Sequence, residues 1–208
     1  MNKEEVQQIL INKLKFSTDD VEKLQIFYEE LLKFNKKYNL ISKSTEGDVW
    51  SRHILDSAQI VKFIDFKQNK SLSDMGSGAG FPGIMLSLFN KNASFHVKLY
   101  EKSNIKCDFL DNIRNKLNMD YEIYGDYRNE DIASEYIVSR AFKKLEEIIR
   151  ISRETIKVNH KLIILKGENA EKEINKLQGF NNIIYKMENS ITDLKSKILI
   201  IDIKKKNE

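Results

Sequence analysis

Hydrophobic residues in the first third of the chain recur at helical spacing. One set of them predicts a first amphipathic helix: Val6, Ile9, Leu10 and Leu14. Residues 17–20 carry the polar side chains typical of a helix start, and apolar residues follow at helical spacing up to Leu32. A third helix is expected to begin after Thr45 and to run to about Val61. Residues 1–64 therefore predict a helical N-terminal segment.

From about residue 70 the pattern changes to short apolar runs that alternate with helical periodicity. The predicted strands are residues 71–75, 95–101, 121–124, 136–139, 162–165, 183–185 and 198–203. The predicted helices are residues 105–117, 145–156 and 168–177, and one more that has Pro82 in its first turn. This alternation is typical of an α/β fold, a mostly parallel sheet with helices on both faces. We expect residues 65–208 to form that domain as one compact unit, with residues 1–64 packed against it.

Composition narrows the classes of function. The 208 residues include 35 Lys and Arg and 31 Asp and Glu, and the net charge of +4 permits nucleic-acid binding without requiring it. Cys107 is the only cysteine and the three histidines are far apart, so we expect no metal. No apolar run is long enough to cross a bilayer, and the charged N-terminus does not resemble a secretion signal. We therefore expect a cytoplasmic protein with no membrane partner, acting as a monomer.

A glycine-rich loop between the first predicted strand and its helix is the strongest chemical signal. Residues 74–83, DMGSGAGFPG, hold four of the eight glycines and the only proline. Such a loop presents backbone N–H groups and a helix N-terminus to a ligand at the carboxyl edge of the sheet. Gly78 begins a G-x-G-x-x-G match, and Glu101 lies where an acid could bind ribose hydroxyls, as in a dinucleotide site. Asp74, two positions before the first of three alternate glycines, favours S-adenosylmethionine instead.

Several segments together resemble the small-subunit ribosomal RNA methyltransferase G family, also called glucose-inhibited division protein B. They are the loop 74–83, similar to D-V-G-S-G-A-G-F-P-G, then N-L at 39–40, R-H-I-L-D-S at 52–57, S-R-A-F at 139–142 and L-K-G at 165–167. The resemblance implies a Rossmann-like methyltransferase sheet with a final antiparallel strand. It also implies S-adenosyl-L-methionine as cofactor, and methyl transfer to N7 of a guanine in the decoding-centre loop of 16S ribosomal RNA. The partner would be that RNA or the small ribosomal subunit.

The resemblance also implies which residues bind the cofactor. Carried over by motif, these are Gly76, Phe81, Tyr127, Arg128 and Arg140. Where the family commonly reads G-R-A-E, this chain reads G-D-Y-R at 125–128. A carboxylate that would accept a hydrogen bond from the adenine amino group is then missing, unless Asp126, Glu130 or Asp131 replaces it.

The implied chemistry needs little from the protein beyond orientation. Guanine N7 carries a free lone pair, so we expect no catalytic acid or base. Cations must hold the RNA phosphates and donors must read the guanine. The candidates for these roles are Arg52, His53, Lys106 and Lys166. Two alternatives are a nucleotide-dependent oxidoreductase that uses the same loop, and a non-catalytic relative that binds RNA.

Overall fold

Seven strands form one mixed sheet in the computed structural model, which describes residues 1–140, 143–177 and 184–205. The strands are β1 (Ser71–Met75), β2 (His96–Tyr100), β3 (Glu122–Tyr124), β4 (Tyr136–Arg140), β5 (His160–Lys166), β6 (Ile184–Asn189) and β7 (Lys197–Ile203). Their order across the sheet is β3-β2-β1-β4-β5-β7-β6. The first five are parallel, and β7 runs antiparallel to both β5 and β6. The predicted α/β fold and its final antiparallel strand are confirmed.

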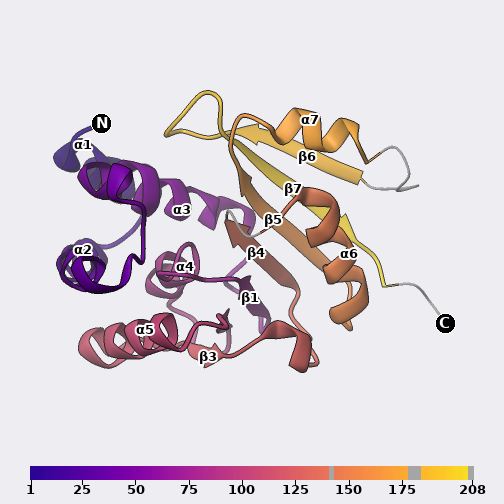
Figure 1. The fold of residues 1–208 in the computed structure, drawn as a ribbon, viewed down its shortest axis with the longest axis horizontal. Helices are drawn as coiled ribbons and strands as arrows, with labels where there is room; N and C mark the ends of the chain where they lie inside the picture. Colours follow the sequence, from indigo (N-terminus) through magenta and orange to yellow (C-terminus); the bar gives the residue numbers. More distant parts are fainter. Residues whose placement is uncertain (141–142, 178–183, 206–208) are drawn as a thin grey trace.

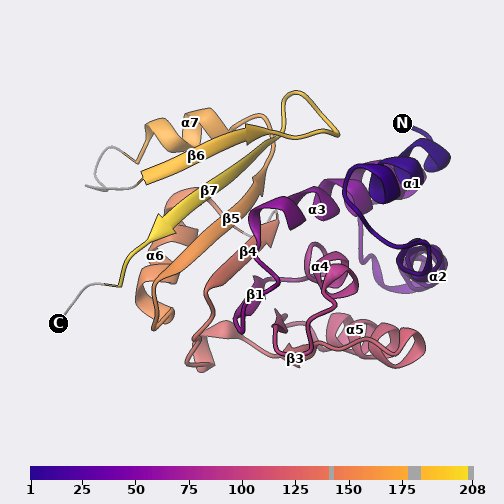
Figure 2. The same ribbon diagram turned by 180° about the vertical axis from the view of Figure 1, so that it is seen from behind.

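Each face of the sheet carries its own hydrophobic cluster, because alternate residues of a strand point to opposite faces. On one face, Val138 and Ile163 pack in a cluster with the N-terminal segment, α4 and α5. On the other face, Ile137 and Leu162 pack with α6. The helices after β1 are α4 (Gly83–Phe89), α5 (Asn104–Leu117), α6 (Leu145–Thr155) and α7 (Ala170–Asn175). In both views, α1 and α2 lie at the opposite side of the molecule from α6 and the C-terminus (Figures 1 and 2).

The N-terminal segment is helical throughout most of its length. Its elements are α1 (Lys3–Asn12), α2 (Thr18–Tyr38), a 3₁₀ segment η1 (Lys43–Asp48), a π-helical segment η2 (Trp50–Leu55), α3 (Asp56–Ala58) and a second 3₁₀ segment η3 (Gln59–Phe63). The predicted helix start at 17–20 is confirmed: Ser17 accepts from the N–H of Asp20, and the Asp20 carboxylate accepts from the N–H of Ser17. The prediction of one third helix was wrong in detail, since the stretch changes helix type three times.

Several other element boundaries differ from the predictions or cannot be compared with them. Pro82 occupies the N-cap position of α4, so it precedes the first turn of that helix and does not lie in it. The helix expected at 168–177 is shorter, because α7 covers only Ala170–Asn175. The last hairpin begins at Ile184, and residue 183 lies outside the described residues.

β1 lies in the middle of the sheet although three of its five residues are polar. All five are buried. The Ser73 hydroxyl hydrogen-bonds the Ser134 hydroxyl at 2.8 Å, and the Ser71 hydroxyl donates to the carbonyl of Ala133 at 3.1 Å. Hydrogen bonding of each buried hydroxyl removes most of the cost of its burial. This strand leads directly into the glycine-rich loop.

Candidate cofactor site

The glycine-rich loop is hydrogen-bonded to the end of the neighbouring strand β2. The N–H groups of Gly76 and Ser77 both donate to the carbonyl oxygen of Tyr100, at 2.9 and 3.0 Å. Gly80 has a φ of +91°, and a Cβ built there would lie 2.3 Å from Cδ1 of Ile84. Both backbone conformation and space therefore require glycine at this position.

Glu101 joins the loop to the segment that follows β2. Its Oε2 accepts from the N–H of Gly78 and its Oε1 accepts from the N–H of Ser103, both at 2.9 Å. The residue is 8% exposed. Its orientation is thus fixed by two backbone groups, and each carboxylate oxygen keeps a lone pair for a ligand.

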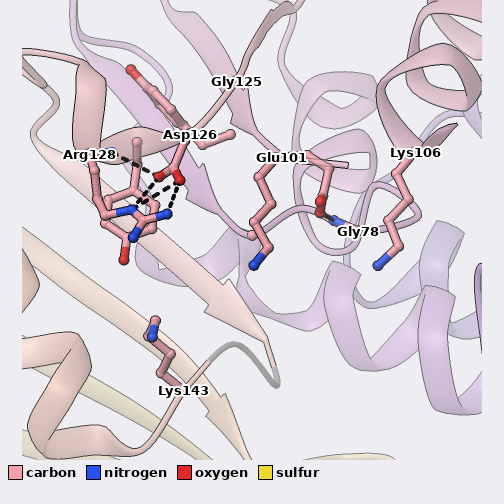
Figure 3. A pocket seen from close by; sticks show the side chains of 11 residues that line it. Gly78, Glu101, Lys106, Gly125, Asp126, Arg128 and Lys143 are labelled. Atoms are coloured by element: carbon pink, nitrogen blue, oxygen red, sulfur yellow. Dashed lines mark hydrogen bonds and ion pairs between the residues drawn. The ribbon is translucent and has the colours of Figure 1, made fainter. Parts of the chain in front are cut away.

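A pocket of about 360 Å³ opens beside this loop (Figure 3). It is lined by Gly76, Gly78, Tyr100, Glu101, Lys102, Lys106, Gly125, Asp126, Tyr127, Arg128 and Lys143. Six predicted site residues meet there: Gly76, Gly78, Glu101, Lys106, Tyr127 and Arg128. They come from three separate parts of the sequence, which the parallel sheet brings to one edge.

Sequence reasoning missed four of the lining residues. Tyr100 and Lys102 flank Glu101, so adjacency to the predicted acid would have indicated them. Gly125 lies directly after β3. Lys143 follows β4 with no pattern that marks it, and only the fold brings it to the pocket.

Residues 125–128 contain an ion pair between Asp126 and Arg128, both of which line the pocket. Nε of Arg128 lies 2.9 Å from Oδ1 and 3.0 Å from Oδ2 of Asp126, and Nη2 also donates to Oδ2. These hydrogen bonds lower the pKa of Asp126 to about 2. A carboxylate, that of Asp126, thus lines the pocket two residues before Arg128 and is paired with it.

Four other predicted residues lie outside this pocket, and they contact one another. Phe81 is 3% exposed, and the guanidinium carbon of Arg140 lies 4.7 Å from its ring centroid. Arg140 donates from Nη1 to the carbonyl of Arg52 at 3.0 Å and from Nη2 to Nδ1 of His53 at 2.7 Å. We call these four residues the Arg140 cluster. It joins the N-terminal segment to β4 and to the glycine-rich loop.

His53 is a neutral hydrogen-bond acceptor in this cluster. The Thr45 hydroxyl donates to the carbonyl of Ser42, so the Nε2–H of His53 donates to Thr45 Oγ1 at 2.8 Å and Nδ1 is left to accept from Arg140. Burial, and then the charges of Arg140 and Arg52, lower the pKa of His53 to about 3. The imidazole therefore carries no charge at neutral pH.

Asp74 and Lys166 hydrogen-bond to the backbone of segments next to the pocket. Asp74 is fully buried, and its Oδ2 accepts from the N–H of Gly83 at 2.8 Å. Burial raises its pKa to about 7. Lys166, at the end of β5, donates to the carbonyl of Lys143 at 2.7 Å and pairs with Glu173 at 2.9 Å. Through the first of these hydrogen bonds, Lys166 stabilises the segment that contains Lys143. Residues 141 and 142 of the S-R-A-F segment lie outside the described residues.

Among residues 1–140, 143–177 and 184–205, no three or more His, Cys, Asp or Glu side chains gather as they would around a metal ion. Within the same ranges, no helix has the length and apolar character needed to cross a membrane.

Solved structures share this fold at low sequence identity. A SAM-dependent methyltransferase from Aquifex aeolicus is 15% identical with a TM-score of 0.59, covering 82% of this chain and 96% of that one. An O-methyltransferase from Bacillus cereus in complex with SAH is 13% identical, also with a TM-score of 0.59, covering 96% and 97%. The fold that these structures share with this chain is that of the Rossmann-like α/β proteins.

Sequence comparison gives the family. The model of rRNA small subunit methyltransferase G, GidB, matches residues 20–201. Two relatives carry the name ribosomal RNA small subunit methyltransferase G. The one from Rickettsia akari is 38% identical over 89% of this chain and 95% of its own length, and the one from Pelagibacter ubique is 36% identical over 88% of each. The chain belongs to the rRNA small subunit methyltransferase G family. The choice between a dinucleotide and S-adenosyl-L-methionine is thereby decided for the latter.

Proposed function

We propose that this protein transfers the methyl group of S-adenosyl-L-methionine to N7 of a guanine in the decoding-centre loop of 16S ribosomal RNA. The observation that carries the proposal is the pocket at the carboxyl edge of the sheet, where the glycine-rich loop, Glu101 and several cations meet. The names of the relatives, which specify small-subunit ribosomal RNA, support the substrate. We also propose that the protein works as a monomer in the cytoplasm.

The residues present fit this cofactor. Gly76 and Gly78 leave room at the pocket floor, with φ values of +74° and +61° that a side chain would disfavour. The free lone pairs of Glu101 suit the two ribose hydroxyls, and its buried carboxylate is held for them by the N–H groups of Gly78 and Ser103. When bound, S-adenosyl-L-methionine supplies an electrophilic methyl group on a sulfonium.

The remaining residues orient the RNA and exclude water. Lys106 lies on the pocket wall, where an ammonium group can hold an RNA phosphate. Arg52 lies at the surface near α3, and Arg140 ties its backbone to the site. We assign Phe81 and Arg140 to positioning the loop, since the ring of Phe81, which belongs to the loop, packs against the Arg140 guanidinium. Orientation of this kind can supply about 7–11 kcal/mol in favourable cases, and no general base is assigned.

Methylation of isolated small ribosomal subunits tests the proposal. Subunits are prepared from cells that lack the protein, incubated with the purified full chain and labelled S-adenosyl-L-methionine, and digested for mass analysis. We expect one new 7-methylguanine. Naked 16S ribosomal RNA assayed in parallel shows which form is the substrate. Binding of S-adenosylhomocysteine without any methyl transfer to either form would instead indicate the non-catalytic RNA-binding relative.

A further inference from the structure

The hairpin of β6 and β7 exposes apolar side chains at its tip. We call residues 190–196, S-I-T-D-L-K-S, the hairpin tip; they connect the two strands. Leu194 is 84% exposed, more than any other large apolar residue of the described chain, and Ile191 is 45% exposed. Apolar side chains that lie together in water favour a partner that covers them.

The hairpin tip is hydrogen-bonded to the N-terminal segment, which fixes its position. The Ser190 and Thr192 hydroxyls donate to Oδ1 of Asp56 at 3.1 and 3.0 Å. Gln59 is fully buried, donates from Nε2 to Oγ of Ser190 and accepts at Oε1 from the N–H of Ile191, both at 2.9 Å. In both views the turn between β6 and β7 extends toward α3 (Figures 1 and 2). The apolar side chains therefore project from a supported turn.

The hairpin tip lies at the edge of the sheet where the cofactor pocket opens. β6 runs antiparallel to β7, and β7 runs antiparallel to β5, so β6 has the direction of β5. Asn189 and Lys166 both pair with Lys197, which places the end of β6 level with the carboxyl end of β5. Four steps across the sheet, of about 4.8 Å each, separate β6 from β1. The ends of these two strands are thus about 19 Å apart along the same edge.

The surroundings of the hairpin tip suit uncharged bases better than phosphates. A cavity of about 280 Å³ lies between the tip and η2, and its lining includes Arg52, one of the predicted RNA-binding residues. Asp48 and Asp56 line the same cavity, and these carboxylates would repel a phosphate. The tip itself carries one acid, Asp193, and one cation, Lys195, so it adds no net charge.

We propose that the hairpin tip is an RNA-binding element, in which Leu194 and Ile191 pack against unpaired bases of the substrate near the methylated guanine. The inference rests on the proposed function, because an RNA that delivers a guanine to the pocket has to lie over the carboxyl edge. Sequence-specific RNA recognition generally uses unpaired bases of loops, whose faces are open to side chains. Leu and Ile are among the side chains that insert between bases in nucleic-acid complexes. The hairpin tip thus contributes to binding of the RNA and not to the chemical step.

The first experiment measures methylation of small ribosomal subunits by the full chain with Leu194→Ala. We expect kcat/KM to fall about tenfold, because alanine removes most of the apolar area that the bases would cover. Tm and S-adenosylhomocysteine affinity should not change, because Leu194 is exposed and does not line the cofactor pocket. Leu194→Phe should match or exceed the wild type, because an aromatic ring stacks on any base.

Ile184→Ala is the matched control. Ile184 is 74% exposed and lies on the same hairpin, at its other end. It pairs with Asp202, which pairs with Lys161 near the start of β5, so it lies at the edge of the sheet away from the pocket. We expect wild-type kcat/KM. Wild-type kcat/KM in Leu194→Ala, or an equal loss in Ile184→Ala, would overturn the proposal.

The second experiment identifies what the hairpin tip contacts. A leucine analogue that carries a photoreactive diazirine replaces Leu194 in the full chain, and the protein is irradiated in complex with small ribosomal subunits. We expect a crosslink to 16S ribosomal RNA, in the loop that contains the methylated guanine. A crosslink only to a ribosomal protein, a crosslink to a distant part of the RNA, or none at all would overturn the proposal.

These outcomes are distinct from failure of the proposed function. If the wild type forms 7-methylguanine in small subunits and Leu194→Ala does so equally well, only the assignment of the hairpin tip is wrong. If the wild type methylates neither subunits nor naked RNA, the proposed function is wrong. The crosslink then decides by itself whether the hairpin tip contacts RNA.

Discussion

Gly83 offers a quantitative test of how tightly the start of α4 packs on the sheet. A Cβ built at this position would lie 2.1 Å from Cδ2 of Leu99 and 2.7 Å from Oδ2 of Asp74. Gly83 is helical, so backbone conformation does not forbid alanine there. Only the lack of space does. Gly83→Ala must push Leu99 aside and break the hydrogen bond between the Gly83 N–H and the buried Asp74 carboxylate.

The size of the effect follows from these two contacts. Overpacking of a filled core costs about 1–3 kcal/mol. Loss of the hydrogen bond to a buried carboxylate costs about 1–3 kcal/mol. The better helix propensity of alanine returns at most about 1 kcal/mol. We expect a loss of about 2–4 kcal/mol in unfolding free energy, and a Tm lower by about 4–15 °C for a domain of this size.

Urea unfolding followed by circular dichroism measures the change. Gly167→Ala is the matched control, because nothing lies within 4 Å of a Cβ at that exposed glycine. We expect Gly167→Ala to stay within about 0.5 kcal/mol of the wild type. Equal stability of Gly83→Ala and Gly167→Ala would refute the reasoning about space at the helix start.

Three further predictions concern titration and ligand binding. The pKa of Asp74 is raised to about 7, so between pH 4 and pH 7 the folded chain keeps a proton that the unfolded chain releases. The unfolding free energy of the wild type relative to Asp74→Asn should therefore fall as the pH rises through this range. The expected fall is on the order of 4 kcal/mol, measured in urea titrations. The lowered pKa of His53, about 3, has the opposite sign. Relative to His53→Asn, whose amide oxygen can still accept from Arg140, the wild type should lose on the order of 3 kcal/mol as pH falls from 6.5 to 4. Glu101→Gln should weaken S-adenosylhomocysteine binding about tenfold in calorimetry, because an amide must turn one donor toward a backbone N–H.

Each of these has a clear contrary result. A stability difference between the wild type and Asp74→Asn that does not change with pH would mean that the carboxyl titrates normally. The same result for His53→Asn would mean that the imidazole is free to take a proton. Wild-type affinity in Glu101→Gln would remove Glu101 from the ribose site.

Most of the architecture follows from local pattern, and the exceptions have physical causes. Strands such as β2 and β5 alternate or run apolar, and the sequence predicts them because their side chains pack on the sheet core. β1 is buried although it is not apolar, because the hydroxyls of its serines hydrogen-bond residues about sixty positions away in the sequence. The glycine loop could be predicted because backbone geometry restricts the residue type there. Glu101 could be predicted because it lies at the end of the next strand, where an acid could bind ribose hydroxyls.

The Arg140 cluster shows where sequence reasoning stops. The motifs at 52–57 and 139–142 indicate that these residues matter, but not that Arg140 and His53 contact each other 87 positions apart. That contact depends on how the N-terminal segment lies on the sheet face. Likewise, the sequence shows an altered segment at 125–128, while the pairing of Asp126 with Arg128 is visible only in three dimensions.

The Arg140 cluster also limits how this chain can be recombined with its relatives. A chimaera joined between η3 and β1 would combine His53 and the Arg52 carbonyl from one parent with Arg140 and Phe81 from the other. A partly buried guanidinium with three such contacts accepts no substitute of different shape, lysine included. Crossovers at this junction are therefore tolerated only between parents that already agree at the three positions that contribute side chains, His53, Phe81 and Arg140, so the two halves are inherited as a pair.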